Sequence, residues 1–368
     1  MNIKTLTGFI VALALPMIAT PAVAYEVNEQ LSVSGVLAGA IQCQDLSDAP
    51  GSSHSCKGAA PLQPEVSFRP TDTDEVFFKL GFAAGNGLNK NSPFVLAPWA
   101  ADLEDDVKDI SGRNRNYLLT AWYRHSFAAG DDHRLGVTLG IIDATDYLDE
   151  NAYANDEYTQ FMNPVLTNGP NVFLPSYDAG VALEWDTGPW SLRGVWMAVG
   201  ENDDGNDYTF YGVQAGYSVS NSLGAGNYRV IITAGSQDFL NPAGTRLEDR
   251  TAALVSVDQE FGRVVGGWAR VGWQTDEAAV DHNAIYSGGL DIKGSAWGRA
   301  DDNIGVGLAC LNGGSLNIDK SRVVEAYYRW QLAKAFGLTA DIQYQHDDYK
   351  AGQGPDGWIY GLRGALEF

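Results

Sequence analysis

Long apolar runs and basic residues are scarce in this sequence, and each scarcity excludes a class of protein. After the first 24 residues no stretch reaches the roughly 18 to 20 continuous apolar residues of a transmembrane helix, so a helical membrane protein is excluded. Lysine and arginine number 24 against 46 acidic residues, a formal charge of −22. Nucleic acid is not an expected partner, because neutralising its phosphates requires a basic surface.

Cysteine is also scarce, with only three in the chain. Cys43 and Cys56 lie in a stretch rich in Ser, Gly and Pro, and we expect a disulfide between them in a first outer loop spanning 42–62. Cys310 is left over and receives no predicted chemistry. Scattered cysteines lack the spacing of a metal site, and the acidic cluster at 143–157 lacks the order of a calcium loop. We therefore expect no metal and no cofactor.

Catalytic motifs are missing as well. The sequence contains neither Gly-x-Ser-x-Gly nor His-Glu-x-x-His. Adjacent acids such as Asp301 and Asp302 would point to opposite faces of a strand, which does not suit a glycosidase pair. The five histidines are scattered and suggest no catalytic pair: His54, His125, His133, His282 and His346. We predict that the protein is not an enzyme and has no catalytic residues.

Residues 1–24 have the three parts of a secretory signal peptide. Lys4 gives a positive start, an apolar run follows from Phe9 to Leu15, and small residues precede a cleavage site after Ala24. The mature chain, 25–368, should begin near Tyr25. Its destination is the periplasm, the outer membrane or the medium.

The mature chain is rich in glycine and aromatic residues and alternates with a period of two. It has 42 glycines, 17 tyrosines and 10 tryptophans in all. In 323–332, apolar residues such as Val324 alternate with polar ones such as Glu325, which is typical of a β-strand. A soluble sandwich also alternates. Here the apolar face ends in aromatics and the other face holds many charged and amide groups, which favours a transmembrane β-barrel with a polar lumen.

Sixteen strands fit the pattern, so the predicted fold is an all-β antiparallel barrel. The even number places both termini on one side. Connections alternate between short turns and an opposite set that includes 85–113 and 144–176. The predicted strands are 28–41, 63–69, 74–84, 114–129, 131–143, 177–187, 189–200, 206–220, 226–236, 248–261, 263–275, 284–294, 301–310, 321–334, 336–347 and 357–368.

The stretch from Leu139 to Pro175 departs from this alternation. Long irregular segments inside compact domains are usually functional or disordered. This one carries aromatic residues that a solvated linker would not need: Tyr147, Tyr153, Tyr158, Phe161 and Phe173. We predict that it folds into the barrel mouth and narrows a pore. The alternative is an ordinary surface loop that caps the barrel.

Five stretches stand out when they are taken together and in order: GIIDATDYLDENAYANDEYTQFMNP (140–164), ARVGW (269–273), GRADDNIGVG (298–307), VEAYYRWQL (324–332) and LTADIQY (338–344). In these stretches the chain resembles one family, the OprB-type carbohydrate-selective porins. The resemblance implies a sixteen-stranded channel for passive diffusion of monosaccharides and small oligosaccharides. The last strand alternates and ends on Phe368, which resembles the signal read by the outer-membrane assembly machinery of Gram-negative bacteria.

A sugar pore needs hydrogen-bonding groups of both charge signs on its wall, because a polyol exchanges bonds to water for bonds to the wall. Inward aromatics such as Trp122, Trp268 and Tyr327 can stack on sugar rings. The alternation aims these charged residues into the lumen: Arg124, Arg193, Arg229, Arg270, Arg329, Glu184, Asp258, Glu325 and Asp341. We expect the narrowest ring where loop residues Asp143, Asp146, Asn155 and Gln160 face Arg124, Arg270 and Glu325.

The expected partners are small neutral sugars, outer-membrane lipid and lipopolysaccharide, and the assembly machinery through Phe368. Two other functions stay open at this point. One is a general porin for small solutes or ions. The other is a plugged barrel with a structural or adhesive role. The oligomeric state is also open.

Overall fold

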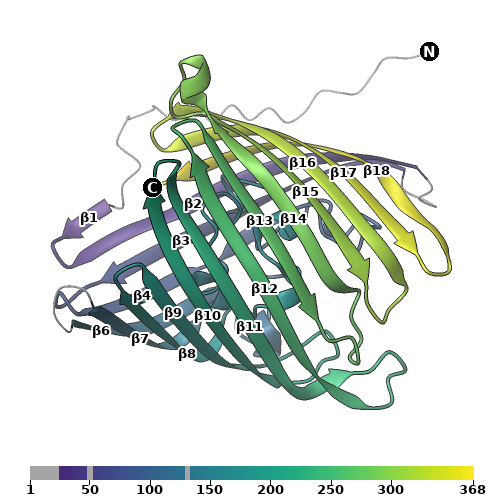
Figure 1. Ribbon diagram of the computed structural model, residues 1–368, viewed down its shortest axis with the longest axis horizontal. Helices are drawn as coiled ribbons and strands as arrows, with labels where there is room; N and C mark the ends of the chain where they lie inside the picture. Colours follow the sequence, from purple (N-terminus) through teal and green to yellow (C-terminus); the bar gives the residue numbers. More distant parts are fainter. Residues whose placement is uncertain (1–24, 48–52, 129–132) are drawn as a thin grey trace.

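The described residues, 25–47, 53–128 and 133–368 of the computed structural model, form one closed antiparallel β-barrel (Figure 1). The predicted signal peptide, 1–24, lies outside the described residues. The strands of the described part are β1 (Tyr25–Asn28), β2 (Leu31–Ser47), β3 (His54–Phe68), β4 (Asp74–Leu80), β5 (Phe82–Ala84), β6 (Leu118–Ala128), β7 (His133–Ile142), β8 (Asp178–Thr187), β9 (Trp190–Val199), β10 (Tyr208–Asn221), β11 (Gly224–Leu240), β12 (Leu247–Phe261), β13 (Val265–Gln274), β14 (His282–Lys293), β15 (Asn303–Gly313), β16 (Ile318–Ala333), β17 (Phe336–Tyr349) and β18 (Gly352–Glu367).

These strands occupy sixteen positions around the barrel, which confirms the predicted fold. β4 and β5 share one position, because both pair with β3. β18 closes the barrel by pairing with β2, and β1 pairs with β2 just beyond the point where β18 ends. Phe368 and Gly35 exchange backbone hydrogen bonds of 3.0 and 2.8 Å across this seam. The C-terminus and the start of β2 therefore lie at the same end of the barrel.

The two faces of each strand follow the predicted alternation. In β16 the side chain of Val324 is 47% exposed on the outside of the barrel, while Glu325 inside is fully buried. In β13 the same rule turns Arg270 inward and Trp273 outward. Outward aromatics include Tyr211, Trp190, Trp196, Phe127, Phe261 and Tyr360. This apolar outer surface suits lipid, and the polar groups are left for the interior.

The connections sort by length as the sequence predicts. At the end of the barrel that holds the C-terminus, the chain turns within a few residues at 188–189, 222–223, 262–264 and 334–335. The opposite end carries the two long connections, 85–117 and 143–177. Short helices interrupt these: η1 (Ile110–Gly112), η2 (Ala144–Asp146), α1 (Pro164–Thr167) and η3 (Pro170–Val172), with η4 (Gly294–Trp297) at the other end. None of the helices in the described residues is long and apolar enough to cross a membrane.

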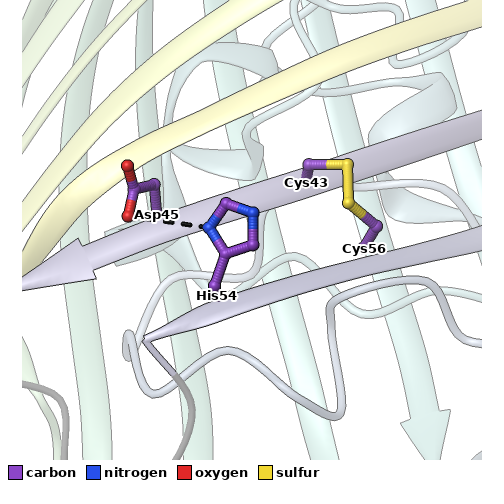
Figure 2. Close-up of a disulfide and its surroundings, with 4 residues drawn as sticks. All are labelled: Cys43, Asp45, His54 and Cys56. Carbon is purple, nitrogen blue, oxygen red and sulfur yellow. Dashed lines mark ion pairs between the residues drawn. A yellow bond between two sulfur atoms is a disulfide. The ribbon is translucent and has the colours of Figure 1, made fainter. Parts of the chain in front are cut away.

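The predicted position of the disulfide is wrong, although the structure joins Cys43 to Cys56. The cysteines are not in a loop but face each other across β2 and β3 (Figure 2). Both strands run further than expected, since pairing continues to Asp45 and His54. In this part of β2 the inward side chains are Gln42 and Gln44. The polar residues that suggested a loop therefore form the face of the strand that points into the lumen.

The predicted strand 74–84 is interrupted in the structure. Gly81 separates β4 from β5, and a Cβ at this position would lie 2.7 Å from a Leu119 side-chain carbon. The next strand begins at Leu118 rather than at residue 114. Tyr117 adopts a left-handed backbone conformation, with φ of 64°, which ends the preceding connection.

The orientation of β16 can be tested by placing a charge on its outer face. Val324→Arg should hinder barrel assembly by about 2 to 4 kcal/mol near mid-bilayer, because the guanidinium would face hydrocarbon. The folded fraction after refolding into lipid is read from the heat-dependent shift in gel mobility. Asp319→Arg, an exposed site at the end of the same strand, is the matched control. Equal loss of folding in both variants would contradict the assigned face.

The disulfide predicts a definite thiol count. Purified protein unfolded without reductant should expose one reactive thiol, Cys310, and the same protein should expose three after reduction. Mass spectrometry after alkylation gives both numbers. Three thiols before reduction would show that the bond between Cys43 and Cys56 does not form.

Candidate functional site

The connection 143–177, which we call the inward loop, lies inside the barrel and is held there by buried charges of the wall. Arg270 on β13 contacts Asp149 of the inward loop, with 2.9 Å between Nε and Oδ2, and both side chains are fully buried. The same guanidinium donates to the backbone carbonyls of Ala154, Leu166 and Thr167. A guanidinium with these partners fixes several turns of the loop at once.

Two more wall residues repeat this arrangement. Glu325 on β16 accepts the backbone N–H groups of Met162 and Asn163 at 2.5 and 3.0 Å. Arg363 on β18 donates to the carbonyls of Glu157 and Gln160, both at 2.7 Å. A buried polar or charged group is strongly unfavourable unless hydrogen bonds satisfy it, so the wall and the inward loop depend on each other.

Apolar side chains also pack between the inward loop and the barrel wall. The Phe161 ring lies 5.6 Å from the ring of Trp268 and 5.2 Å from that of Tyr327, in edge-to-face geometry. Gly307 on β15 leaves room for it, because a Cβ there would lie 2.9 Å from the Phe161 ring. Trp268 and Tyr327 are thus buried beneath the loop, which contradicts their predicted exposure to sugar. Trp122 instead stacks on Phe77, with ring centroids 4.9 Å apart.

Local sequence explains the one α-helical turn of the inward loop. The Asn163 side chain accepts the N–H of Val165 and so caps α1, and Pro164 occupies the first helical position. Val165 and Leu166 then point into the apolar cluster against β14, β15 and β16. The turn therefore buries its apolar side against the wall.

The connection 85–117, which we call the second loop, packs against the inward loop. Trp99 is almost fully buried, and its indole N–H donates to the carbonyl of Glu157 at 2.9 Å. The N–H of Ala100 donates to the carbonyl of Met162 at 2.7 Å. Gln42 and Gln343 of the wall both donate to the carbonyl of Pro98. The lumen is thus filled by two loops that are tied to each other and to the wall.

The described residues of the lumen enclose a mouth cavity, an inner cavity and a smaller third cavity. The mouth cavity lies at the end with the long connections and includes 201–204 in its wall. The inner cavity, of about 630 Å³, is bounded by the inward loop and by Gln63, Glu65 and Lys79. A third cavity of about 300 Å³ lies toward the opposite end and shares Glu150 with the inner cavity.

The mouth and inner cavities meet at seven residues, which we call the neck: Ala100, Asp102, Pro164, Phe173, Leu174, Ser176 and Tyr177. The Tyr177 hydroxyl donates to Asp102 at 2.5 Å, and the Gln63 amide donates to the same carboxylate oxygen at 2.7 Å. Burial raises the pKa of Asp102 to about 6. Because one side of the neck comes from the second loop and the other from the inward loop, its width depends on both.

The inner cavity is strongly acidic. Lys79, which pairs with Glu65 at 3.3 Å, is the single basic side chain among the described residues that line it. Burial raises the pKa of Asp146 to about 7, and burial followed by the charge of Asp156 raises the pKa of Glu157 to about 8. The acidic lining residues are Glu65, Asp102, Asp143, Asp146, Glu150, Asp156 and Glu157.

Five of the predicted lining residues face these cavities. Asp143, Asp146 and Asn155 line the inner cavity. Arg193 and Arg229 line the third cavity. They pair with Asp186 at 2.8 Å and with Asp258 at 2.6 Å. Charged side chains of both signs therefore lie beside the third cavity, toward the end that holds the C-terminus.

The predicted narrow ring is not formed as expected. Arg270 and Glu325 are fully buried under the inward loop and do not face water, and Asp341 is buried near them. Gln160 bonds to the loop's own backbone at Ala152, Asn155 and Asp156. Arg124 pairs with Glu184 at 3.2 Å, and Arg329 pairs with Glu367 at 3.0 Å. The inward loop lies deeper in the barrel than the sequence suggested. Arg270 and Glu325, which were expected to line the pore, therefore anchor the loop instead.

Two residues that the sequence did not single out form the polar part of the neck. Asp102 lies in the second loop, outside the predicted strands, and Tyr177 stands at the start of the predicted strand 177–187. Lys79 lies between the outward residues Phe78 and Leu80 in β4, and this alternation is a sequence signal that could have identified it. Tyr177 has a left-handed backbone, with φ of 60°, which no pattern in the sequence indicates.

Comparisons with known proteins agree with this architecture. The profile of the family described as "Carbohydrate-selective porin, OprB family" matches residues 179–363. An uncharacterized protein of Aquifex aeolicus (strain VF5) is 31% identical over 296 residues, which cover 79% of this chain and 85% of that protein.

Solved structures share the fold at low identity. The high-pH structure of Pseudomonas putida OprB superposes with a TM-score of 0.72 at 12% identity, covering 92% of this chain and 94% of that one. The outer membrane channel DcaP of Acinetobacter baumannii gives a TM-score of 0.56 at 10% identity, covering 92% and 97%. With the family match over half of the chain, the barrel and its internal passage identify the protein as a member of the OprB family of carbohydrate-selective porins, an outer-membrane channel and not an enzyme.

Proposed function

We propose that the protein lets monosaccharides and small oligosaccharides diffuse passively across the outer membrane of a Gram-negative bacterium. The observation that carries this proposal is the neck, where two cavities meet between the inward loop and the second loop. An open sixteen-stranded barrel is too wide to contact a single small solute. The two loops reduce the lumen to a passage whose walls a sugar must touch.

The chemistry of the passage suits a polyol. A sugar entering the neck exchanges bonds to water for bonds to protein, so donors and acceptors must follow one another along its path. Tyr177, Ser176 and Asp102 supply them at the neck, and Phe173 and Leu174 supply an apolar side for the C–H face of a sugar ring. Thr145, Asn155 and Gln63 continue the polar lining into the inner cavity.

A second candidate is a porin for small ions and solutes that prefers cations. The acidic lining of the inner cavity, with Lys79 as its single described base, favours it. Liposome swelling with isomeric sugars of equal size, and with small cations and anions, separates the two candidates. A sugar channel admits sugars of equal size at different rates, whereas a cation-preferring porin distinguishes sugars by size alone and admits small cations faster than small anions.

Replacing 147–170 with a short Gly/Ser linker should raise single-channel conductance severalfold and abolish discrimination among sugars. The barrel should still assemble. Without the loop, Arg270, Glu325 and Arg363 would face a water-filled lumen, and water would replace their lost hydrogen-bond partners. Planar-bilayer recording and liposome swelling measure the two effects. Replacing 241–246, a turn outside the cavities, with a linker of equal length is the control. Unchanged conductance in the 147–170 variant would place the passage elsewhere.

Ion preference should depend on pH. Asp102, Asp146 and Glu157 have raised pKa values of about 6, 7 and 8, so they are ionised above pH 8 and neutral at pH 5. The permeability ratio of K⁺ to Cl⁻, read from reversal potentials in a KCl gradient, should therefore fall as the pH drops from 9 to 5. Glu157→Gln should remove the most alkaline part of this change. A ratio independent of pH would contradict the acidic passage.

A further inference from the structure

The mouth cavity contains a cluster of aromatic rings around one arginine. Arg250 on β12 holds its guanidinium carbon 4.3 Å from the ring centroid of Phe173 and 5.1 Å from that of Phe239. Tyr208 packs against Phe239, with ring centroids 4.8 Å apart. All four side chains line the mouth cavity, and we call them the mouth cluster.

The donors of Arg250 are largely unused. Its Nη2 donates to the Gln274 amide oxygen at 2.7 Å, while its Nε is buried and has no acceptor among the described residues. No described carboxylate forms an ion pair with it, whereas Arg193, Arg229 and Arg270 each have one. A guanidinium that lines a cavity without an ion-pair partner has donors available to a solute.

Two features of the backbone hold the aromatic rings of the mouth cluster in place. Phe173 has a left-handed backbone, with φ of 37°, which is costly for a bulky residue and is maintained here by the surrounding fold. Gly235 on β11 leaves space for Phe239, because a Cβ there would lie 2.7 Å from that ring. Both features place aromatic surface beside the Arg250 guanidinium.

The charge around the cluster selects the class of solute. Glu201, Asp203 and Asp204 line the same cavity and repel an anion. A neutral polyol suits both signs, because its hydroxyl groups accept from the guanidinium and donate to carboxylates. The aromatic rings offer surface for the C–H face of a pyranose.

We propose that the mouth cluster binds a neutral pyranose before it enters the neck. Phe173 belongs to both the mouth cluster and the neck, so a sugar bound there is already at the entrance to the passage. This inference rests on the proposed function and adds a binding step to it. The guanidinium fork and the aromatic surface together provide the recognition.

The test measures how D-glucose blocks the small-ion current through single channels in a planar bilayer. Arg250→Gln and Arg250→Lys should each raise the half-blocking glucose concentration by about tenfold or more, because both lose the planar fork. Arg246→Gln removes the same charge from an exposed site close to Arg250 and should leave the block unchanged. Phe239→Leu should weaken the block while keeping apolar volume.

The outcomes separate this inference from the proposed function. If wild-type protein passes glucose in liposome swelling but both Arg250 variants retain the wild-type block, the mouth cluster is not a binding site. If Arg250→Lys retains the block while Arg250→Gln loses it, only the charge acts and the proposed fork is wrong. If wild-type protein neither passes glucose nor is blocked by it, the proposed function fails, and this inference fails with it.

Discussion

Buried contacts between wall charges and the backbone of the inward loop are the interaction on which the rest of this structure depends. Arg270, Glu325 and Arg363 come from three different strands and bind backbone groups of one loop. Each would be unfavourable in the buried site without its hydrogen-bond partners, and breaking a buried ion pair such as that of Arg270 with Asp149 typically costs about 3 to 5 kcal/mol. The barrel therefore specifies the position of the loop, and the loop satisfies the interior of the barrel.

Under the proposed function, this arrangement places selectivity in the loops and not in the wall. A pore lined directly by strands would have a width set by the number of strands. Here the inward loop and the second loop enclose the neck, and its polar side chains Asp102 and Tyr177 come from these loops and not from the strands. The same fold can thus hold passages of different chemistry.

The sequence predicted the strands well, because alternation is a local property of the chain. In β16, Val324 and Glu325 already differ in hydropathy, so their faces could be assigned without coordinates. The depth of the inward loop was not predictable in this way. A buried Arg270 and a cavity-lining Arg193 look alike in an alternating strand, and only the packing of the loop separates them. The second loop was missed because its conformation depends on left-handed residues and contacts distant in sequence.

The central claim is that solutes pass through the neck, and thiol modification at Ser176 tests it most directly. In a Cys310→Ser background, Ser176→Cys should react with a bulky, water-soluble thiosulfonate and lose most of its ion current and glucose permeation. Asp319→Cys, at an exposed site outside the lumen, should react without loss of either. Full current and glucose permeation after complete modification of Ser176→Cys would show that the passage does not run through the neck.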